Sequence, residues 1–148
     1  MMAIVTELNS TKNIKDFKDK SLLIVDDDNP FRERLARAME KKGFVVTQAE
    51  SVKKGIDSLK MTKPAFAVVD LRLNDGNGLE VVKEIQYLNA NSRIIMLTGY
   101  GNIPTAVSAI KHGAIDYLAK PADADDVEKA LLADPKSKAQ PPENPMTA

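Results

Sequence analysis

The stretch SLLIVDDDNPF, residues 21–31, places consecutive aspartates directly after a run of apolar residues. The same arrangement returns along the chain: Asp70 follows AFAVV, Thr98 follows IIML, and Lys120 follows IDYLA. If each apolar run is a strand of one parallel sheet, these polar side chains emerge at its carboxyl edge, where ligands bind in open α/β sheets. Carboxylates, a hydroxyl and an amine at one edge are typical of a magnesium-dependent phosphoryl acceptor.

The region around these runs alternates between strand-like and helix-like patterns. Strand-like runs cover residues 21–25, 44–48, 65–70, 93–97 and 114–118. All but the second are nearly continuous apolar runs, as strands buried on both faces require, whereas the mixed second run suits an edge. Amphipathic segments lie between them, the first of which stops at Gly43. The alternation predicts an α/β fold, a (βα)5 doubly wound, five-stranded parallel sheet with helices on both faces.

The composition describes one ordinary domain with a core. The 148 residues balance 21 basic against 21 acidic side chains, so the chain has no general attraction for nucleic acid or an anionic membrane. The absence of cysteine excludes disulfides and thiolate chemistry within the chain. No apolar run approaches the length of a membrane span, and the first residues lack the apolar region of a secretory signal. We therefore expect a cytoplasmic protein with no membrane partner.

Three segments are expected from changes in composition. Residues 1–20 show no sustained period and predict a tail or a weak helix. Residues 21–134 form the α/β domain. Residues 135–148 are rich in proline and predict a semi-extended linker or tail.

Each polar strand end has a chemical interpretation. Asp28 or Asn29 suffices to cap the following helix, which leaves Asp26 and Asp27 as an acidic pair. Clustered carboxylates repel one another, and a hard divalent cation relieves that repulsion. Asp70 precedes a separate turn sequence, so its carboxylate is available as a nucleophile toward a phosphoryl group.

The balance of charges indicates a role for Lys120. Three carboxylates, one Mg²⁺ and one ammonium sum to zero, and an acyl phosphate on one carboxylate adds about one negative charge. That charge would attract the Thr98 hydroxyl and tighten the Lys120 ion pair. Pro121 restricts the backbone before it and leaves a cis peptide bond possible.

The four blocks IVDDDNPFR, VVDLRLNDGNG, IIMLTGYG and DYLAKPAD occur in the order seen in the receiver domains of two-component response regulators, which residues 21–134 resemble. The resemblance implies a flavodoxin-like or CheY-like fold with strand order 2-1-3-4-5. It also implies a phosphoacceptor signalling domain, rather than an enzyme, that catalyses only its own phosphotransfer and dephosphorylation. The residue roles that it implies are Asp70 as phosphoacceptor, Asp26, Asp27, Asp70 and the backbone carbonyl of Arg72 as Mg²⁺ ligands, Thr98 and Lys120 as phosphoryl contacts, and Tyr117 as the switch aromatic.

Within that family the chain resembles the RegA/PrrA/ActR group of redox-responsive regulators, through GNGLEVV, the segment LTGYGNIPTAVSAIKHGAIDYLAKPAD and the tail PPENPMTA. The resemblance implies a sensor histidine kinase as partner and a homodimer through the fourth helix, fifth strand and fifth helix. Such proteins continue into a Fis-type helix-turn-helix that binds DNA. We expect a truncated form here, with DNA binding only through an output domain absent from this chain.

The alternative from another class is a phosphatase of the haloacid-dehalogenase type, with Asp26 as nucleophile and Asp28 as acid/base. Pro30 stands where that family has Thr or Val, and a later paired acidic motif is missing. A nucleotide-binding module is weaker still, because neither of the usual glycine-rich phosphate motifs occurs.

Overall fold

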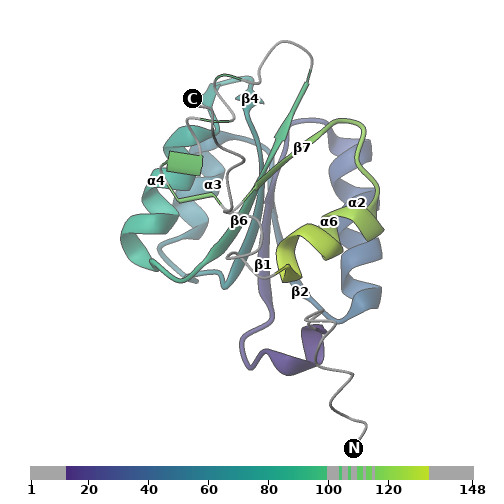
Figure 1. Ribbon diagram of the computed structural model, residues 1–148. Coiled ribbons are helices and arrows are strands. Elements are labelled where there is room, and N and C mark those ends of the chain that lie inside the picture. Colours follow the sequence, from purple (N-terminus) through teal and green to yellow (C-terminus); the bar gives the residue numbers. More distant parts are fainter. Residues whose placement is uncertain are drawn as a thin grey trace, which may run out of the picture.

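The apolar runs form the strands of a parallel sheet in the computed structural model, which describes residues 13–99, 104, 107, 110, 111, 113, 114 and 116–133. The five-stranded sheet has the order β2-β1-β3-β6-β7 (Figure 1). Its strands are β1 (Ser21–Val25), β2 (Val45–Ala49), β3 (Phe66–Asp70), β6 (Arg93–Thr98) and β7 (Asp116–Ala119). Because β6 and β7 are the fourth and fifth strands of this sheet, the predicted order 2-1-3-4-5 is confirmed.

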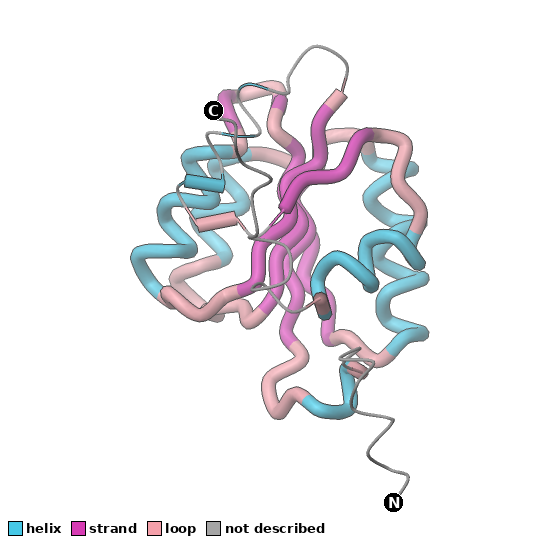
Figure 2. Tube along the Cα trace, viewed as in Figure 1, coloured by secondary structure: helices cyan, strands magenta, loops and turns pink. Residues whose placement is uncertain are grey.

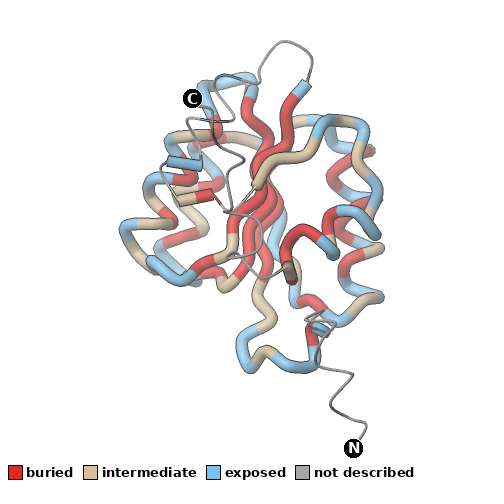
Figure 3. The backbone as a smooth tube through the Cα atoms, viewed as in Figure 1, coloured by how far each residue is buried: buried red, intermediate tan, exposed pale blue. Residues whose placement is uncertain are grey.

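Helices cover both faces of the sheet, as Figures 1 and 2 show. α2 (Asn29–Lys42) and α6 (Ala124–Leu132) lie on one face, and α3 (Val52–Ser58) and α4 (Leu79–Leu88) on the other. The side chains of the strands contribute to two apolar clusters, one on each face of the sheet, because alternate residues of a strand point to opposite faces. In β1, Leu22 and Ile24 belong to the cluster on the α2 side, and Leu23 and Val25 to the cluster on the α3 and α4 side. Figure 3 shows the central strands β1, β3 and β6 as the buried layer between them, whereas the outer strands β2 and β7 are largely exposed or half-buried.

The local signals for the first helix act as predicted. The Asp28 carboxylate caps α2 by accepting a hydrogen bond from the Phe31 backbone N–H at 3.1 Å. Gly43 ends the helix at a φ of 113°, a left-handed conformation that favours glycine. The edge position predicted for the second strand is also confirmed, since β2 pairs only with β1 among the described strands.

Several predicted strand boundaries differ from the observed ones by one or two residues. Phe44 precedes β2 because its N–H bonds to Met39 O in the helix C-cap, so pairing starts at Val45. Thr98 belongs to β6 instead of following it, since its carbonyl accepts the Lys120 N–H at 2.8 Å and extends the ladder with β7.

Three short elements add to the five predicted strands and their helices. The segment after Asp70, expected to be only a flexible turn, forms the short antiparallel pair β4 (Arg72–Leu73) and β5 (Gly76–Asn77). The 3₁₀ helix η1 (Ile14–Asp16) lies in the segment expected to be a tail or weak helix, and its Ile14 is buried in the α2 face of the core. Phe17 after it packs edge-on against Phe66 at the start of β3.

The predicted fourth helix, residues 103–110, falls largely outside the described residues, as does the segment 135–148. Among the helices that the structure describes, none combines the length and the apolar character that a membrane span requires.

Candidate functional site

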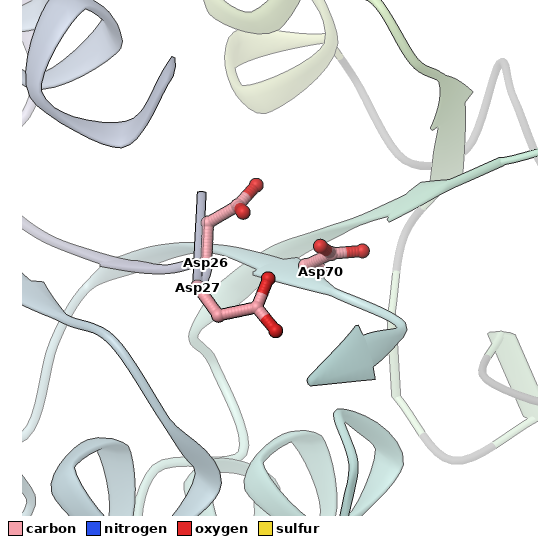
Figure 4. Close-up of side chains that lie close together, drawn as sticks. All are labelled: Asp26, Asp27 and Asp70. Carbon is pink, nitrogen blue, oxygen red and sulfur yellow. The ribbon is translucent and has the colours of Figure 1, made fainter. Parts of the chain in front are cut away.

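Three carboxylates meet at the carboxyl edge of the sheet. Asp26 and Asp27 follow β1, Asp70 ends β3, and one oxygen from each lies within 4.8 Å of the others (Figure 4). The strands β1 and β3 are paired in register, with Val25 opposite Val69, so the residues after them share one edge. The predicted convergence of these three side chains is confirmed.

The backbone around Asp26 is held by several hydrogen bonds. The Asp26 N–H donates to Ala49 O at 3.1 Å, and its Oδ1 accepts the Asp28 N–H at 2.9 Å. The Asp26 side chain has no exposed surface, whereas Asp27 is half-buried. One carboxylate is therefore enclosed and the other faces the opening of the cluster.

Lys120 supplies the cation of the cluster from the end of β7. Its Nζ lies 2.9 Å from Asp26 Oδ2 and 3.3 Å from Asp70 Oδ2. Burial by itself would lower the pKa of Lys120, but hydrogen bonds to Asp26 and attraction by both carboxylates outweigh it and raise the pKa. Lys120 is thus a permanent cation at neutral pH, joined to Pro121 by a cis peptide bond.

The surroundings of Asp70 raise the pKa of its carboxyl group. Its pKa is raised to about 6, first by burial and then by the negative charge of Asp26, against the opposing effects of Lys120 and of the Arg72 N–H. That N–H donates to Asp70 Oδ1 at 3.3 Å. At neutral pH the Asp70 carboxylate is therefore largely ionised, but held in surroundings that resist its charge.

Thr98 and Tyr117 lie near the cluster on the neighbouring strands. The buried Thr98 hydroxyl donates to Gly99 O at 3.1 Å, so its single proton is turned toward its own loop rather than toward a carboxylate. Tyr117 is half-buried and packs against the α3 and α4 side of the core. Thr98 is the last residue of β6, at the carboxyl edge, whereas Tyr117 lies two residues before the end of β7.

Sequence reasoning missed two residues that support the site, Arg32 and Asp75. Buried Arg32 donates from Nη1 to Asp26 O at 2.8 Å and from Nε to Gln48 Oε1 at 2.9 Å, which ties the loop after β1 to the edge strand β2. Asp75 accepts the N–H groups of Val52 and Lys53 at 2.8 and 3.0 Å, which fixes the β4–β5 turn on the start of α3. The position of Arg32 in the first turn of the predicted helix, shortly after the aspartates, was a usable signal, because it keeps the guanidinium within reach of the strand end.

Gly78 allows the chain after β5 to approach the end of β3 closely. A Cβ at this position would overlap the backbone carbonyl oxygen of Asp70 and lie 2.9 Å from Val69 Cγ1. The Gly78 N–H donates to Leu71 O at 2.8 Å. Glycine is therefore required for the start of α4 to pack beside Asp70.

Comparisons with known proteins agree with this geometry. Residues 22–132 match the response regulator receiver domain family. The chain is 60% identical over 130 residues to the acid tolerance regulatory protein ActR of Rhizobium meliloti, covering 88% of this chain and 67% of that protein. It is 58% identical to the photosynthetic apparatus regulatory protein RegA of Cereibacter sphaeroides, with 88% and 71% covered.

Solved structures show the same fold. A response regulator protein from Burkholderia pseudomallei, crystallised with a phosphorylated aspartic acid, calcium ion and citrate, superposes with a TM-score of 0.75 at 38% identity over 80% of this chain and 70% of that one. FixJ-N gives a TM-score of 0.68 at 32% identity over 78% and 92% of the two chains. The phosphatase alternative is not supported, and Asp28, its required acid/base, is instead occupied in capping α2.

Proposed function

We propose that this chain, which belongs to the response regulator receiver family of two-component systems, accepts a phosphoryl group on the carboxylate of Asp70. The observation that carries this proposal is the ion-paired cluster in which Lys120 Nζ bridges Asp26 and Asp70 beside Asp27. Asp70 is the member at the end of the central strand β3, with one oxygen beside the Arg72 N–H and the other beside Lys120 Nζ.

The chemistry follows from the protonation states. The ionised Asp70 oxygen attacks the phosphorus of a phosphohistidine, the O–P bond forms, and the N–P bond to the histidine breaks. The product adds about one negative charge beside Asp26, which only a nearby cation can offset. Lys120 is that cation, and we propose that it pairs with the new phosphoryl oxygens.

The residues present fit a divalent cation. Three carboxylates and one ammonium leave a net charge of −2, and carboxylate oxygens are the hard donors that Mg²⁺ prefers. We propose Asp26, Asp27, Asp70 and the backbone carbonyl of Arg72 as its ligands. When bound, Mg²⁺ would neutralise charge between the carboxylates and a phosphoryl oxygen.

The switch that we propose begins at Thr98. A phosphoryl group on Asp70 offers the Thr98 hydroxyl a charged acceptor in place of Gly99 O, and a charged acceptor forms the stronger hydrogen bond. Tyr117 lies on the adjacent strand β7, opposite Met96 of β6, and would follow Thr98 into the space that it leaves. Phosphorylation would thus shift an equilibrium between two arrangements of this edge.

The partners that we propose follow from the family. A sensor histidine kinase supplies the phosphoryl group, and the protein acts as a signalling domain in the cytoplasm rather than as an enzyme with turnover. The relatives ActR and RegA are regulatory proteins longer than this chain, and FixJ of Azorhizobium caulinodans, 39% identical over 100 residues, is a transcriptional regulatory protein. These names support control of a DNA-binding output domain, and the receiver face of the fourth helix, β7 and α6 is our proposed homodimer surface.

Mapping the phosphoryl site tests the proposal. The protein is incubated with Mg²⁺ and acetyl phosphate, and the modified aspartate is identified by mass spectrometry after borohydride trapping. We expect modification at Asp70, its loss in D70N, and no change in D57N, a matched control on the exposed surface of α3. Modification at Asp26 with Asp70 untouched would contradict the assignment.

A further inference from the structure

We propose that Phe31 is a positioning residue for phosphotransfer, whose aromatic face holds the Lys120 ammonium over Asp26 and Asp70. The Lys120 Nζ lies 4.8 Å from the centroid of the Phe31 ring. This inference rests on the proposed role of Asp70 as phosphoacceptor. It adds a residue from the first turn of α2 to the reaction edge of the sheet.

The Phe31 ring is a further partner for the Lys120 ammonium, in addition to the two carboxylates. An ammonium has three N–H donors. Two acceptors, Asp26 Oδ2 at 2.9 Å and Asp70 Oδ2 at 3.3 Å, contact it, and the Phe31 ring lies within cation–π range. The Lys120 side chain is only 24% exposed, so the ring replaces part of the water shell that the ammonium loses.

The position of the ring is set by the same helix start that holds Asp26. The Phe31 N–H bonds to the Asp28 cap, and the next residue, Arg32, bonds to the backbone carbonyl of Asp26. Phe31 is itself 9% exposed and packs into the α2 and α6 side of the core. The start of α2 therefore brings an aromatic face and an anchored carboxylate to the same ammonium.

An aliphatic side chain at position 31 would fill the space of the Phe31 ring but would not attract the Lys120 ammonium. Phe31 and Pro121 both line a groove of about 510 Å³ between α2 and the start of α6. Without an aromatic face the ammonium would gain by turning toward water in that groove, away from the Asp70 oxygen at which the phosphoryl charge develops. The ring thus keeps Lys120 pre-organised for the transition state.

A graded series of ring variants tests the proposal at constant shape. Phe31 is replaced site-specifically by 4-fluoro-, 3,5-difluoro- and pentafluorophenylalanine, and phosphorylation by acetyl phosphate is timed at saturating Mg²⁺. Fluorination withdraws charge from the ring face without opening a cavity, so we expect the rate to fall step by step, reaching about five-fold at pentafluorophenylalanine. F31Y, which retains an aromatic face, should keep most of the parent rate, and the affinity for Mg²⁺ should change less than two-fold in all variants.

The matched control repeats the series in the Lys120→Met variant. This variant lacks the ammonium through which the ring is proposed to act. Rates, or beryllofluoride affinities if the rates are too slow, should then be independent of fluorination. Equal rates across the series in the parent, or the same decline without Lys120, would overturn the inference. If the parent chain is not phosphorylated on Asp70, the proposed function itself fails; phosphorylation on Asp70 with a flat series removes only the role of Phe31.

Discussion

The two ends of β3 differ as strongly as any two places in this molecule. The strand begins at Phe66, whose ring makes edge-to-face contacts with Phe17 and Phe44 at centroid distances of 5.1 and 5.2 Å. It ends at Asp70, which is buried against a second carboxylate and one ammonium. At the amino end the aromatic contacts of the strand are favourable. At the carboxyl end, carboxylates of like charge lie close together in an enclosed space.

The difference shows how stability and function are separated along one strand. Aromatic contacts at the amino end stabilise the native state whatever the solution contains. The carboxylate cluster is stable only to the extent that Lys120, a proton or a cation offsets its charge. The negative charge of the cluster is not fully offset in the metal-free protein, so a cation or a phosphoryl group can change the state of the site. The same uncompensated charge lowers the stability of the folded protein.

The largest effect should come from truncating Phe66 at the amino end. Phe66→Ala removes a fully buried ring, and we expect the free energy of unfolding in urea to fall by about 3–5 kcal/mol. The Mg²⁺ affinity of the folded fraction should be unchanged, because the site lies at the other end of the strand. A loss of Mg²⁺ affinity parallel to the loss of stability would show that the two ends are not independent.

Lys120→Met should act on function at the carboxyl end. Loss of the cation that meets the phosphoryl charge should slow phosphorylation of Asp70 by about 10²- to 10³-fold, equivalent to roughly 3–4 kcal/mol of barrier. Mg²⁺ should bind more tightly, since the net charge of the cluster becomes more negative. Lys83→Met, on the exposed side of α4, is the control for removing a lysine; slow phosphorylation in both variants would refute the assignment.

The third prediction concerns pH in the metal-free protein. The pKa of Asp70 is raised to about 6, mainly by burial, above the value of about 3.9 for an unfolded chain. Between these values only the folded state holds the proton, so the free energy of unfolding falls as pH rises from about 4 to 6. Because solvent screens part of the charge, we expect about 1–2 kcal/mol, measured by urea unfolding in EDTA.

Asp70→Asn provides the control for this titration. The amide cannot ionise, so the fall between about pH 4 and 6 should disappear. The metal-free melting temperature at neutral pH should rise, because one of the repelling charges is gone. An unchanged or lower melting temperature in EDTA would mean that the cluster is not strained by charge.

The smallest effect should come from Asp75, which lies in the β4–β5 turn beyond the carboxyl end of β3. The pKa of Asp75 is held below its usual value by the backbone N–H groups of Lys53 and Val52. Its contribution is therefore present above the unfolded pKa and is lost as pH falls through the lower, folded value. Asp75→Asn should lower the melting temperature slightly and weaken Mg²⁺ binding slightly, through the β4–β5 turn; an effect as large as that of Lys120→Met would give Asp75 a direct role.

The fold and the centre of the site were predictable because a parallel sheet converts sequence into position. Asp26, Asp70 and Lys120 each follow a run that becomes a strand, and the ends of parallel strands meet without further information. The β4–β5 pair was not predictable from NDGNG, since turn residues allow several backbone paths. The contact that selects one of them, Asp75 on α3, joins residues more than twenty positions apart.

The sequence by itself determined the order of the elements, the caps of α2 and the sheet edge at which three carboxylates and a lysine gather. Local propensity and periodicity are sufficient for the elements and their caps, and the parallel arrangement of the strands then brings their carboxyl ends to one edge. The tertiary structure alone decided that Arg32 anchors Asp26, that Phe31 faces Lys120, and that Thr98 turns toward Gly99. These are choices among side-chain directions, and they depend on packing and charge in the folded protein, because a sequence pattern predicts which face a residue occupies and not which partner its side chain takes.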